Sequence, residues 1–588
     1  MKRKNIIENN KKKTESIKDK QPNLKIKRSI SLFHKNAKKL FPEEMGNNKS
    51  ANLFKFGLNE LNKATKKSNE PWVCIRNNKS NAQEEKIFNE IPDNGFPPKK
   101  VISRAIKKFF NGVPNWRNPD IQYNICAPVN ITSQALMSLA QELNIHNINN
   151  DFAGNCLLVE KIISEMMADL IDIKRNKVKA LFSFGGTASN MYAMKLAINK
   201  SIPDAGKIGV PSNIYLFITS NAHFSHKTGG DWLGIGVDRL ITIDADSEGR
   251  SLSRDAEHKA RRIIEKGGII AGFLLNGGPF YNFTIDNVSE FVKLRSKLIK
   301  DYNLGYIPHI HVDSVIGWIW LMFNKYNFKK NPLNISPKIL PIIKKQFNRA
   351  YKIRLADSWG VDFHKALGGC PTPCGLFVSS KGHELMLLSK SNRGICDTHH
   401  LGGDWSIDDP SDITLETSRS AGPALAALGS LLTMGKNGFR RFLANQIMAT
   451  KNLRDLIPNE TDFIVGNPGS LGFNTIVVIA PREIQGGKKQ NWKSFLSLVE
   501  RDEKLLTHLN NKLKLFYEWN FKETKSDYSK KLGCSFSKSF YKTKSGKTIS
   551  GLKYCLVSPH ISEFTIKKEI RKLKEQFEKF SRISKDES

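Results

Sequence analysis

Cysteine is scarce in this sequence, with 8 in 588 residues and no evenly spaced framework. This excludes the disulfide scaffold of a small secreted domain. The first forty residues contain no apolar segment of the kind found in a secretory signal. The longest apolar runs, such as Val315 to Phe323, are about half the ~20 residues that a membrane helix needs. We therefore expect a cytoplasmic protein with no membrane span.

Negative charge is also in short supply, because 92 Lys and Arg outnumber 56 Asp and Glu, for a formal charge of +36. Residues 1–110 carry 27 basic and 11 acidic residues, and residues 481–588 carry 25 and 13, so the excess lies at the two ends. Residues 1–80 also lack periodicity, which predicts a basic, largely disordered extension. A solvated tail is the simpler interpretation, and contact with nucleic acid or an anionic surface is the alternative.

The length predicts more than one domain. Short apolar runs alternate with amphipathic stretches, and we predict buried strands at Ile214 to Thr219, Leu240 to Ile243, Ile269 to Leu275, Ile310 to Val312 and Gly375 to Val378. This alternation is typical of an α/β fold with a mainly parallel sheet covered on both faces. We place the large domain at residues 151–435, after an N-terminal segment at 81–150. Residues 436–588 are predicted to form a smaller α+β domain that ends in an amphipathic helix.

The most informative stretch runs from Asp357 to Gly369, where Lys365 directly follows His364 between two apolar strands. A lysine in such surroundings needs an ionic or covalent partner. Partial desolvation would lower the pKa of its amine and make it a nucleophile for a Schiff base. Another strand ends at Asp313, a carboxylate that requires a cationic or hydrogen-bonded partner when buried.

Two further segments carry candidate binding groups. Phe184 to Asn190 combines glycines and hydroxyls with the start of a helix, which suits a phosphate. His223 follows a predicted strand. Taken singly, the first is more often a tight turn and the second merely a hydrogen-bonded histidine.

In this order the motifs resemble those of the pyridoxal-phosphate-dependent group II amino-acid decarboxylases, a family that includes glutamate, cysteine-sulfinate and aromatic amino-acid decarboxylases. The resemblance runs from about residue 120 to 580 and rests on Phe182 to Gly186, Ser189 to Met194, His223 to Ser225, His311 to Asp313, and His364 with Lys365. It implies the fold-type I architecture of the aspartate aminotransferase-like transferases, pyridoxal 5'-phosphate as cofactor, and a homodimer with active sites at the subunit interface.

The resemblance also implies a role for each matching residue. Lys365 would form the Schiff base with the cofactor, Asp313 would pair with the pyridine nitrogen, and His223 would stack over the ring. His364 would orient the cofactor next to the lysine. The phosphate would be bound by Gly186, Thr187, Ala188, Ser189 and Ser358.

Three departures from the family pattern bear on substrate and outcome. Asn276 to Pro279 lacks the hydroxyls that the family has there. The segment Gly394 to His400 lacks the family's tyrosine, so His399 or His400 would supply the proton, unless the segment is an ordinary polar loop. Lys553 stands where glutamate decarboxylases have an arginine. As a point charge it is a candidate partner for the substrate α-carboxylate, and it disfavours glutamate as the substrate.

Other polar residues are predicted to be structural. Cys370 and Cys374 lack the second ligand pair of a zinc site, so we expect no metal. Arg419 is expected to be structural or dimer-facing. The implied function is decarboxylation of an L-amino acid to an amine and carbon dioxide. The alternatives are a lyase or aldehyde-forming enzyme of the same fold, and a non-catalytic binding protein.

Overall fold

The computed structural model describes residues 48–65, 70–75, 91–395, 409–480 and 491–586, apart from Asn94, Phe280, Lys525 and Ser526, with a few single positions before residue 43. The chain divides into two compact units. One comprises Met1–Ser68 with Val73–Val113, and the other Asn69–Trp72 with Pro114–Ser588. No helix in the described ranges is long and apolar enough to cross a membrane.

In the first unit, helices α2 (Asn48–Ala64) and α4 (Pro98–Phe109) pack against each other. Helix α2 lies within a stretch for which the sequence predicted little regular structure. Its half-buried positions recur at helical spacing, but they include Gly57 and Glu60 beside Phe56 and Leu61. Because this face mixes apolar and polar residues, its periodicity is weak in the sequence.

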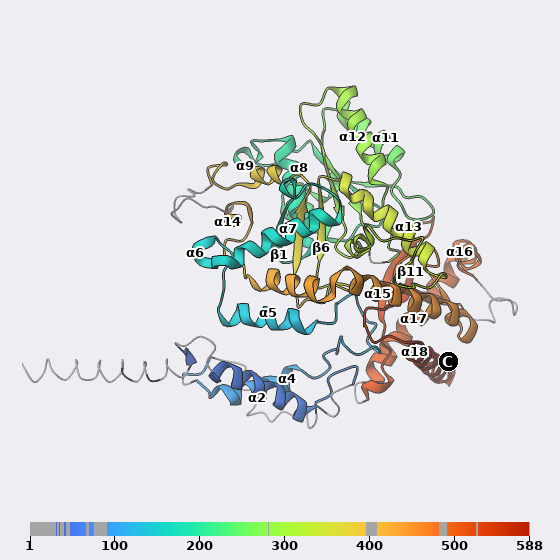
Figure 1. Ribbon diagram of the computed structural model, residues 1–588. Coiled ribbons are helices and arrows are strands. Elements are labelled where there is room, and N and C mark those ends of the chain that lie inside the picture. Colours follow the sequence, from blue (N-terminus) through green and yellow to red (C-terminus); the bar gives the residue numbers. More distant parts are fainter. Residues whose placement is uncertain are drawn as a thin grey trace, which may run out of the picture. The chain divides into compact units, whose positions relative to one another are not determined.

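The second unit is built on a seven-stranded sheet of order β1-β7-β6-β5-β4-β2-β3. Its strands β1 and β6 are labelled in Figure 1. Strands β6, β5, β4, β2 and β3 run parallel, and β7 is antiparallel to both β1 and β6. The mainly parallel α/β sheet is thus confirmed. In sheet order, the strands are β1 (Lys179–Ser183), β7 (Gly375–Ser379), β6 (Ser358–Asp362), β5 (His309–Asp313), β4 (Ile269–Asn276), β2 (Ile214–Thr219) and β3 (Leu240–Ile243).

Both faces of this sheet are covered, as neighbouring residues on its strands demonstrate. Phe217 and Phe273 join one buried cluster, whereas Leu216 and Leu274 join another. Successive strand residues point to opposite faces, so the two clusters lie on the two sides of the sheet. The surrounding helices are α5 (Ile131–Glu142), α6 (Asn150–Ala153), α7 (Leu158–Leu170), α8 (Gly186–Ser201), α9 (Ala205–Ile208), α10 (Ser225–Trp232), α11 (Ser253–Ile264), α12 (Val288–Tyr302), α13 (Leu340–Ala350) and α14 (Pro410–Ile413).

The C-terminal part of this unit has the predicted α+β character. Helix α15 (Gly422–Glu460) is bent at Gly435, where φ is 57°. An antiparallel sheet follows, with strand order β10 (Ser535–Lys542), β11 (Thr548–Cys555), β9 (Asn474–Ile479) and β8 (Phe463–Val465). It packs with α16 (Trp492–Arg501), α17 (Glu503–Glu523) and α18 (Glu563–Asp586). The predicted apolar face of α18 is buried in this core.

An aromatic cage surrounds Lys531 in the same unit. Its Nζ lies 3.6 Å from the centroid of the Trp72 ring and 4.3 Å from that of Phe521. Lys531 is 7% exposed and Trp72 is 4% exposed. Burial lowers the pKa of Lys531 to about 8. The cation–π contact with Trp72 attaches a residue that precedes the large sheet to the C-terminal region.

Candidate active site

The candidate site is built where parallel strands of the large sheet end. Asp313 is the last residue of β5, Asp362 is the last residue of β6, and Lys365 follows three residues later. Beyond β6 the chain turns sharply, with a left-handed φ of 52° at Ala366. The amide of Ala366 donates to Ile125 O over 2.7 Å. Backbone pairing on both sides of Lys365 therefore fixes where its side chain begins.

The lysine has an acidic partner that the sequence did not single out. Lys365 Nζ lies 2.7 Å from Oδ2 of Asp362, whose carboxylate is fully buried. Burial by itself lowers the pKa of Lys365, but the charges of Asp362 and Asp313 outweigh burial and raise it above its usual value. The expectation that desolvation lowers this pKa is therefore wrong, because it ignored a carboxylate three residues away.

Asp313 is held by two side chains. Oδ2 accepts a hydrogen bond from Asn190 Nδ2 over 3.0 Å and lies 3.3 Å from His226 Nε2. Burial raises the pKa of Asp313, but its contacts with His226 and Asn190 and the charge of Lys365 hold it well below its usual range. An ionised carboxylate at this position can neutralise a cationic ring nitrogen. Sequence reasoning missed His226, although it follows His223 by three residues.

His223 is oriented by a short hydrogen-bond chain. Its Nδ1 lies 2.8 Å from Ser225 Oγ, which accepts from Asn190 Nδ2 over 3.0 Å. Burial lowers the pKa of His223, against the opposing effect of Asp313, so its ring is neutral at pH 7. Asn190 also donates to Asp313, so the chain of hydrogen bonds connects His223 with Asp313. The charges of both Asp313 and Lys365 act on the His223 ring.

The start of α8 forms the phosphate-binding candidate. Gly185 has a φ of 131°, and the amide of Gly186 donates to Asp362 Oδ2 over 3.2 Å. A Cβ on Gly186 would lie 2.6 Å from Val315 Cγ1, so only glycine permits this approach. Thr187 and Ala188 complete the first turn, where helix amides have no acceptor within the helix.

Two of the remaining predicted residues lie beside this turn. His364 Cε1 is 3.4 Å from the place that a Cβ on Gly185 would take, and His364 Nδ1 accepts from Cys374 N over 3.1 Å. Ser189 is fully buried, and its hydroxyl donates to Leu376 O over 3.3 Å. The position of Ser189 therefore fits the prediction, but its hydroxyl is engaged by strand β7.

Ser358 lies away from this group. It is the first residue of β6, four residues before Asp362, which corresponds to about 13 Å along an extended strand. Its Oγ lies 2.7 Å from His309 Nε2 and 2.8 Å from His311 Nδ1. We therefore correct its assignment: Ser358 belongs to a polar network at the amino ends of the strands and not to the phosphate site.

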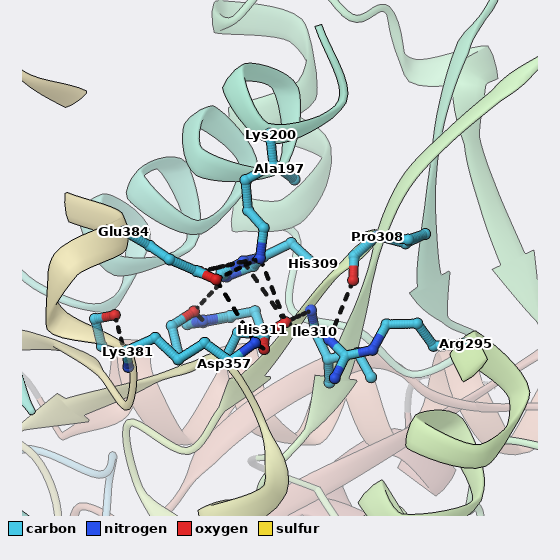
Figure 2. A network of polar contacts seen from close by, with 12 residues as sticks. Ala197, Lys200, Arg295, Pro308, His309, Ile310, His311, Asp357, Lys381 and Glu384 are labelled. Carbon is cyan, nitrogen blue, oxygen red and sulfur yellow. Dashed lines mark hydrogen bonds and ion pairs between the residues drawn. The ribbon is translucent and has the colours of Figure 1, made fainter. Parts of the chain in front are cut away.

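That network, which we call the Asp357 network, comprises Asp357, Arg295, Lys200, Lys381 and Glu384 with His309 (Figure 2). Asp357 is 1% exposed, pairs with Arg295, and lies 2.8 Å from Lys381 Nζ and 3.9 Å from Lys200 Nζ. Glu384 lies 3.0 Å from Lys200 Nζ. The network thus joins α8 and α12 to the segments around β5, β6 and β7.

Lys553 lies on β11, in the C-terminal sheet. The charges of Lys553 and Lys365 both lower the pKa of the Cys126 thiol, although burial is the larger effect and raises it. Residue 126 also pairs with Lys365 through the backbone. Cys126 therefore links the predicted substrate-binding lysine to the region around Lys365.

The remaining predictions have mixed outcomes. Cys370 and Cys374 are buried free thiols, and no cluster of three His, Cys, Asp or Glu side chains suited to a metal occurs among the described residues. Arg419 is structural, since its guanidinium contacts Glu160 over 3.1 Å and donates to Phe182 O. His399 and His400 lie outside the described residues.

The fold, with a lysine and an aspartate at the carboxyl ends of a mainly parallel sheet, is that of the group II decarboxylases. The pyridoxal-dependent decarboxylase conserved domain matches residues 81–473, and the chain belongs to that family.

The curated relatives are distant. The acidic amino acid decarboxylase GADL1 of Homo sapiens is 26% identical over 296 residues, covering 50% of this chain and 50% of the relative. For GADL1 of Xenopus tropicalis the identity is 24% over 290 residues, with 49% and 51% covered. The match thus spans about half the length of these relatives.

Solved structures share the fold at lower identity. Mouse CSAD in its apo form has a TM-score of 0.69 at 16% identity, with 90% of this chain and 98% of that chain covered. Oryza sativa TDC with PLP and tryptamine has a TM-score of 0.69 at 12% identity, with 92% and 99% covered. Rhodiola rosea 4-hydroxyphenylacetaldehyde synthase has a TM-score of 0.64 at 13% identity, with 91% and 97% covered.

Proposed function

We propose that this protein converts an L-amino acid to the corresponding amine and carbon dioxide, with pyridoxal 5'-phosphate bound at Lys365. The observation that carries the proposal is the convergence of Lys365, Asp313 and His223 beyond the ends of the parallel strands, where the charges of Lys365 and Asp313 act on each other and on the His223 ring.

The residues present fit this cofactor. Asp313 remains ionised and suits a protonated pyridine nitrogen, while the start of α8 suits a phosphate. His223 has a neutral ring that suits stacking. When bound, the cofactor supplies an electron-accepting ring for the negative charge left by departing carbon dioxide.

The protein's own residues have defined tasks in this proposal. Lys365 provides the amine, and Asn190 with His226 keeps Asp313 aligned and charged. Lys553 would attract the substrate carboxylate and so help to select which bond of the substrate breaks. Because one ammonium makes a single-point contact, a substrate with a second carboxylate is disfavoured. His399 or His400 is the proposed proton donor.

We also propose a homodimer. Phe184 and Phe224 adjoin the site residues and are 46% and 72% exposed. Large exposed apolar side chains beside a site suit coverage by another subunit. Sedimentation of the cofactor-bound protein would test this proposal, and a monomer that is fully active would contradict it.

An aldehyde-forming reaction is the second candidate. It is favoured by the sequence Gly394 to His400, which contains no tyrosine, and by the fold shared with a 4-hydroxyphenylacetaldehyde synthase. Slow reprotonation would leave time for oxygen to accept two electrons, so that amino acid, oxygen and water would give aldehyde, carbon dioxide, ammonia and hydrogen peroxide instead of amine.

The deciding experiment incubates the full chain with pyridoxal phosphate and a panel of L-amino acids, followed by mass spectrometry of the products. Amine with carbon dioxide supports decarboxylation, and aldehyde with peroxide supports the alternative. Lys553→Met should raise KM about tenfold or more for the accepted substrate, since it removes one charge-assisted contact. An unchanged KM would remove Lys553 from the substrate site.

A further inference from the structure

Asp362 occupies a position with two competing demands. Its carboxylate is fully buried, and its Oδ2 accepts from the Gly186 amide over 3.2 Å while lying 2.7 Å from Lys365 Nζ. It therefore takes the first amide of the helix turn that suits a phosphate and also binds the amine that must react. The other carboxylate oxygen, Oδ1, is buried without a hydrogen-bond partner in the described part of the chain.

These contacts oppose cofactor capture in two ways. A carboxylate at the start of α8 repels a second anion there, because like charges a few ångströms apart in a buried site interact strongly. An ion pair with Asp362 also favours the protonated amine, whereas only the neutral amine attacks a carbonyl.

Few cationic groups offset this carboxylate. Lys365 and His364, both in the turn after β6, lie close to the Asp362 carboxylate, and His364 Nε2 is 3.8 Å from Asp362 Oδ2. Its charge also reaches His223 and the buried thiol of Cys374. Arginine is absent from these contacts among the described residues, so Lys365 is the principal source of compensating charge.

We propose that Asp362 competes with the cofactor phosphate for the amides of α8 and holds the Lys365 amine in an ion pair. Both contacts slow and weaken cofactor binding. The proposal rests on the proposed cofactor site and adds a regulatory residue to it. It makes Asp362 a positioning residue, which acts through Lys365 and the α8 amides.

Inorganic sulfate tests the first half without any turnover. Asp362→Asn keeps the size and an acceptor oxygen but removes the charge. We expect sulfate to bind the cofactor-free full chain at least about tenfold more tightly in this variant, measured by calorimetry at constant ionic strength. Asp286→Asn is the matched control, because Asp286 is also a buried aspartate that accepts backbone amides, from Ser251 and Asn276. Equal or weaker sulfate binding in Asp362→Asn would overturn the proposal.

Pyridoxal, which lacks the phosphate, tests the second half. Its reaction with Lys365, followed by absorbance, should be several-fold faster in Asp362→Asn than in the natural protein, and pyridoxal phosphate should gain more than pyridoxal. An unchanged rate with pyridoxal would also overturn the proposal. If asparagine prevents folding, Asp362→Ser serves the same comparison. If the natural protein yields no amine but Asp362→Asn binds sulfate more tightly, the proposed function would be wrong and the role of Asp362 would stand.

Discussion

Two buried aspartates lie at opposite ends of strand β6 and have opposite surroundings. Asp357, just before the strand, lies among Arg295, Lys381 and Lys200. Asp362, at its end, has Lys365 as its close cationic partner. Asp357 thus has more than one cationic partner for its single negative charge. The Lys365 side chain, in contrast, is 26% exposed and ends near the candidate site. The comparison shows that a buried aspartate has a structural role where several fixed cations surround it. It bears on the chemistry where its one close cation is the lysine that must react.

Lys365→Ala should have the largest effect. Without the amine, turnover should fall by at least about 10⁴-fold and the absorbance of the lysine-bound cofactor should disappear. Stability should fall as well, because the buried Asp362 carboxylate would lose its principal compensating charge. Steady-state kinetics and an absorbance spectrum would check this, and retention of both signals would remove Lys365 from the chemistry.

Asp357→Asn should chiefly reduce stability. It leaves Arg295, Lys381 and Lys200 without their shared carboxylate, and breaking such a buried pair costs about 3–5 kcal/mol. Urea unfolding would measure the loss. Asp455→Asn is the control, because its pair with Lys451 is exposed and should contribute less than about 1 kcal/mol. Equal losses in the two variants would contradict the structural role of Asp357.

Asp313→Asn should affect catalysis more than stability, in contrast to Asp357→Asn. It removes the ionised carboxylate that suits a ring nitrogen, so kcat should fall by about 10²-fold or more. The amide can still accept from Asn190, and the unfolding midpoint should move less than in Asp357→Asn. Parallel kinetic and urea measurements would decide, and a normal kcat would contradict the role of Asp313.

The smallest predicted effect is a pH dependence of stability. Burial lowers the pKa of His311 to about 3, and burial also holds the pKa of His309 well below its usual value. The unfolded chain binds these protons first, so stability should decline as the pH falls from about 6.5 towards 3. His311→Gln should reduce the slope between about pH 6.5 and 4.5, whereas exposed His258→Gln should not. The low pKa of Asp357 affects only more acidic conditions. Identical slopes in all three proteins would refute the prediction.

The sequence predicted those strands and helices whose apolar pattern is unbroken. The predicted strand ranges agree with β2 and β3, and the predicted amphipathic helix at the end of the chain agrees with α18. Strand β1 was missed, and β6 was missed because Ser358, Gly360 and Asp362 interrupt its apolar pattern. These polar residues bond across the sheet, and no local pattern encodes such contacts.

The candidate site was predictable as a set of positions but not as a set of contacts. Lys365, Asp313 and His223 do interact, yet the ion pair with Asp362 reversed the expected direction of the Lys365 pKa. Ser358 was misplaced because its distance from Lys365 along the sequence says little about which end of a strand it occupies. His226 was missed because it resembles any helical histidine.

The contact between Trp72 and Lys531 bears on how the chain can be shortened for experiments. The conserved domain match begins at residue 81, so a version trimmed to that boundary would lose the indole ring. Lys531 would retain Phe521 and the more distant Tyr528 ring, with one side of its ammonium open to water. Expression clones intended to preserve the C-terminal sheet should therefore start before Asn69.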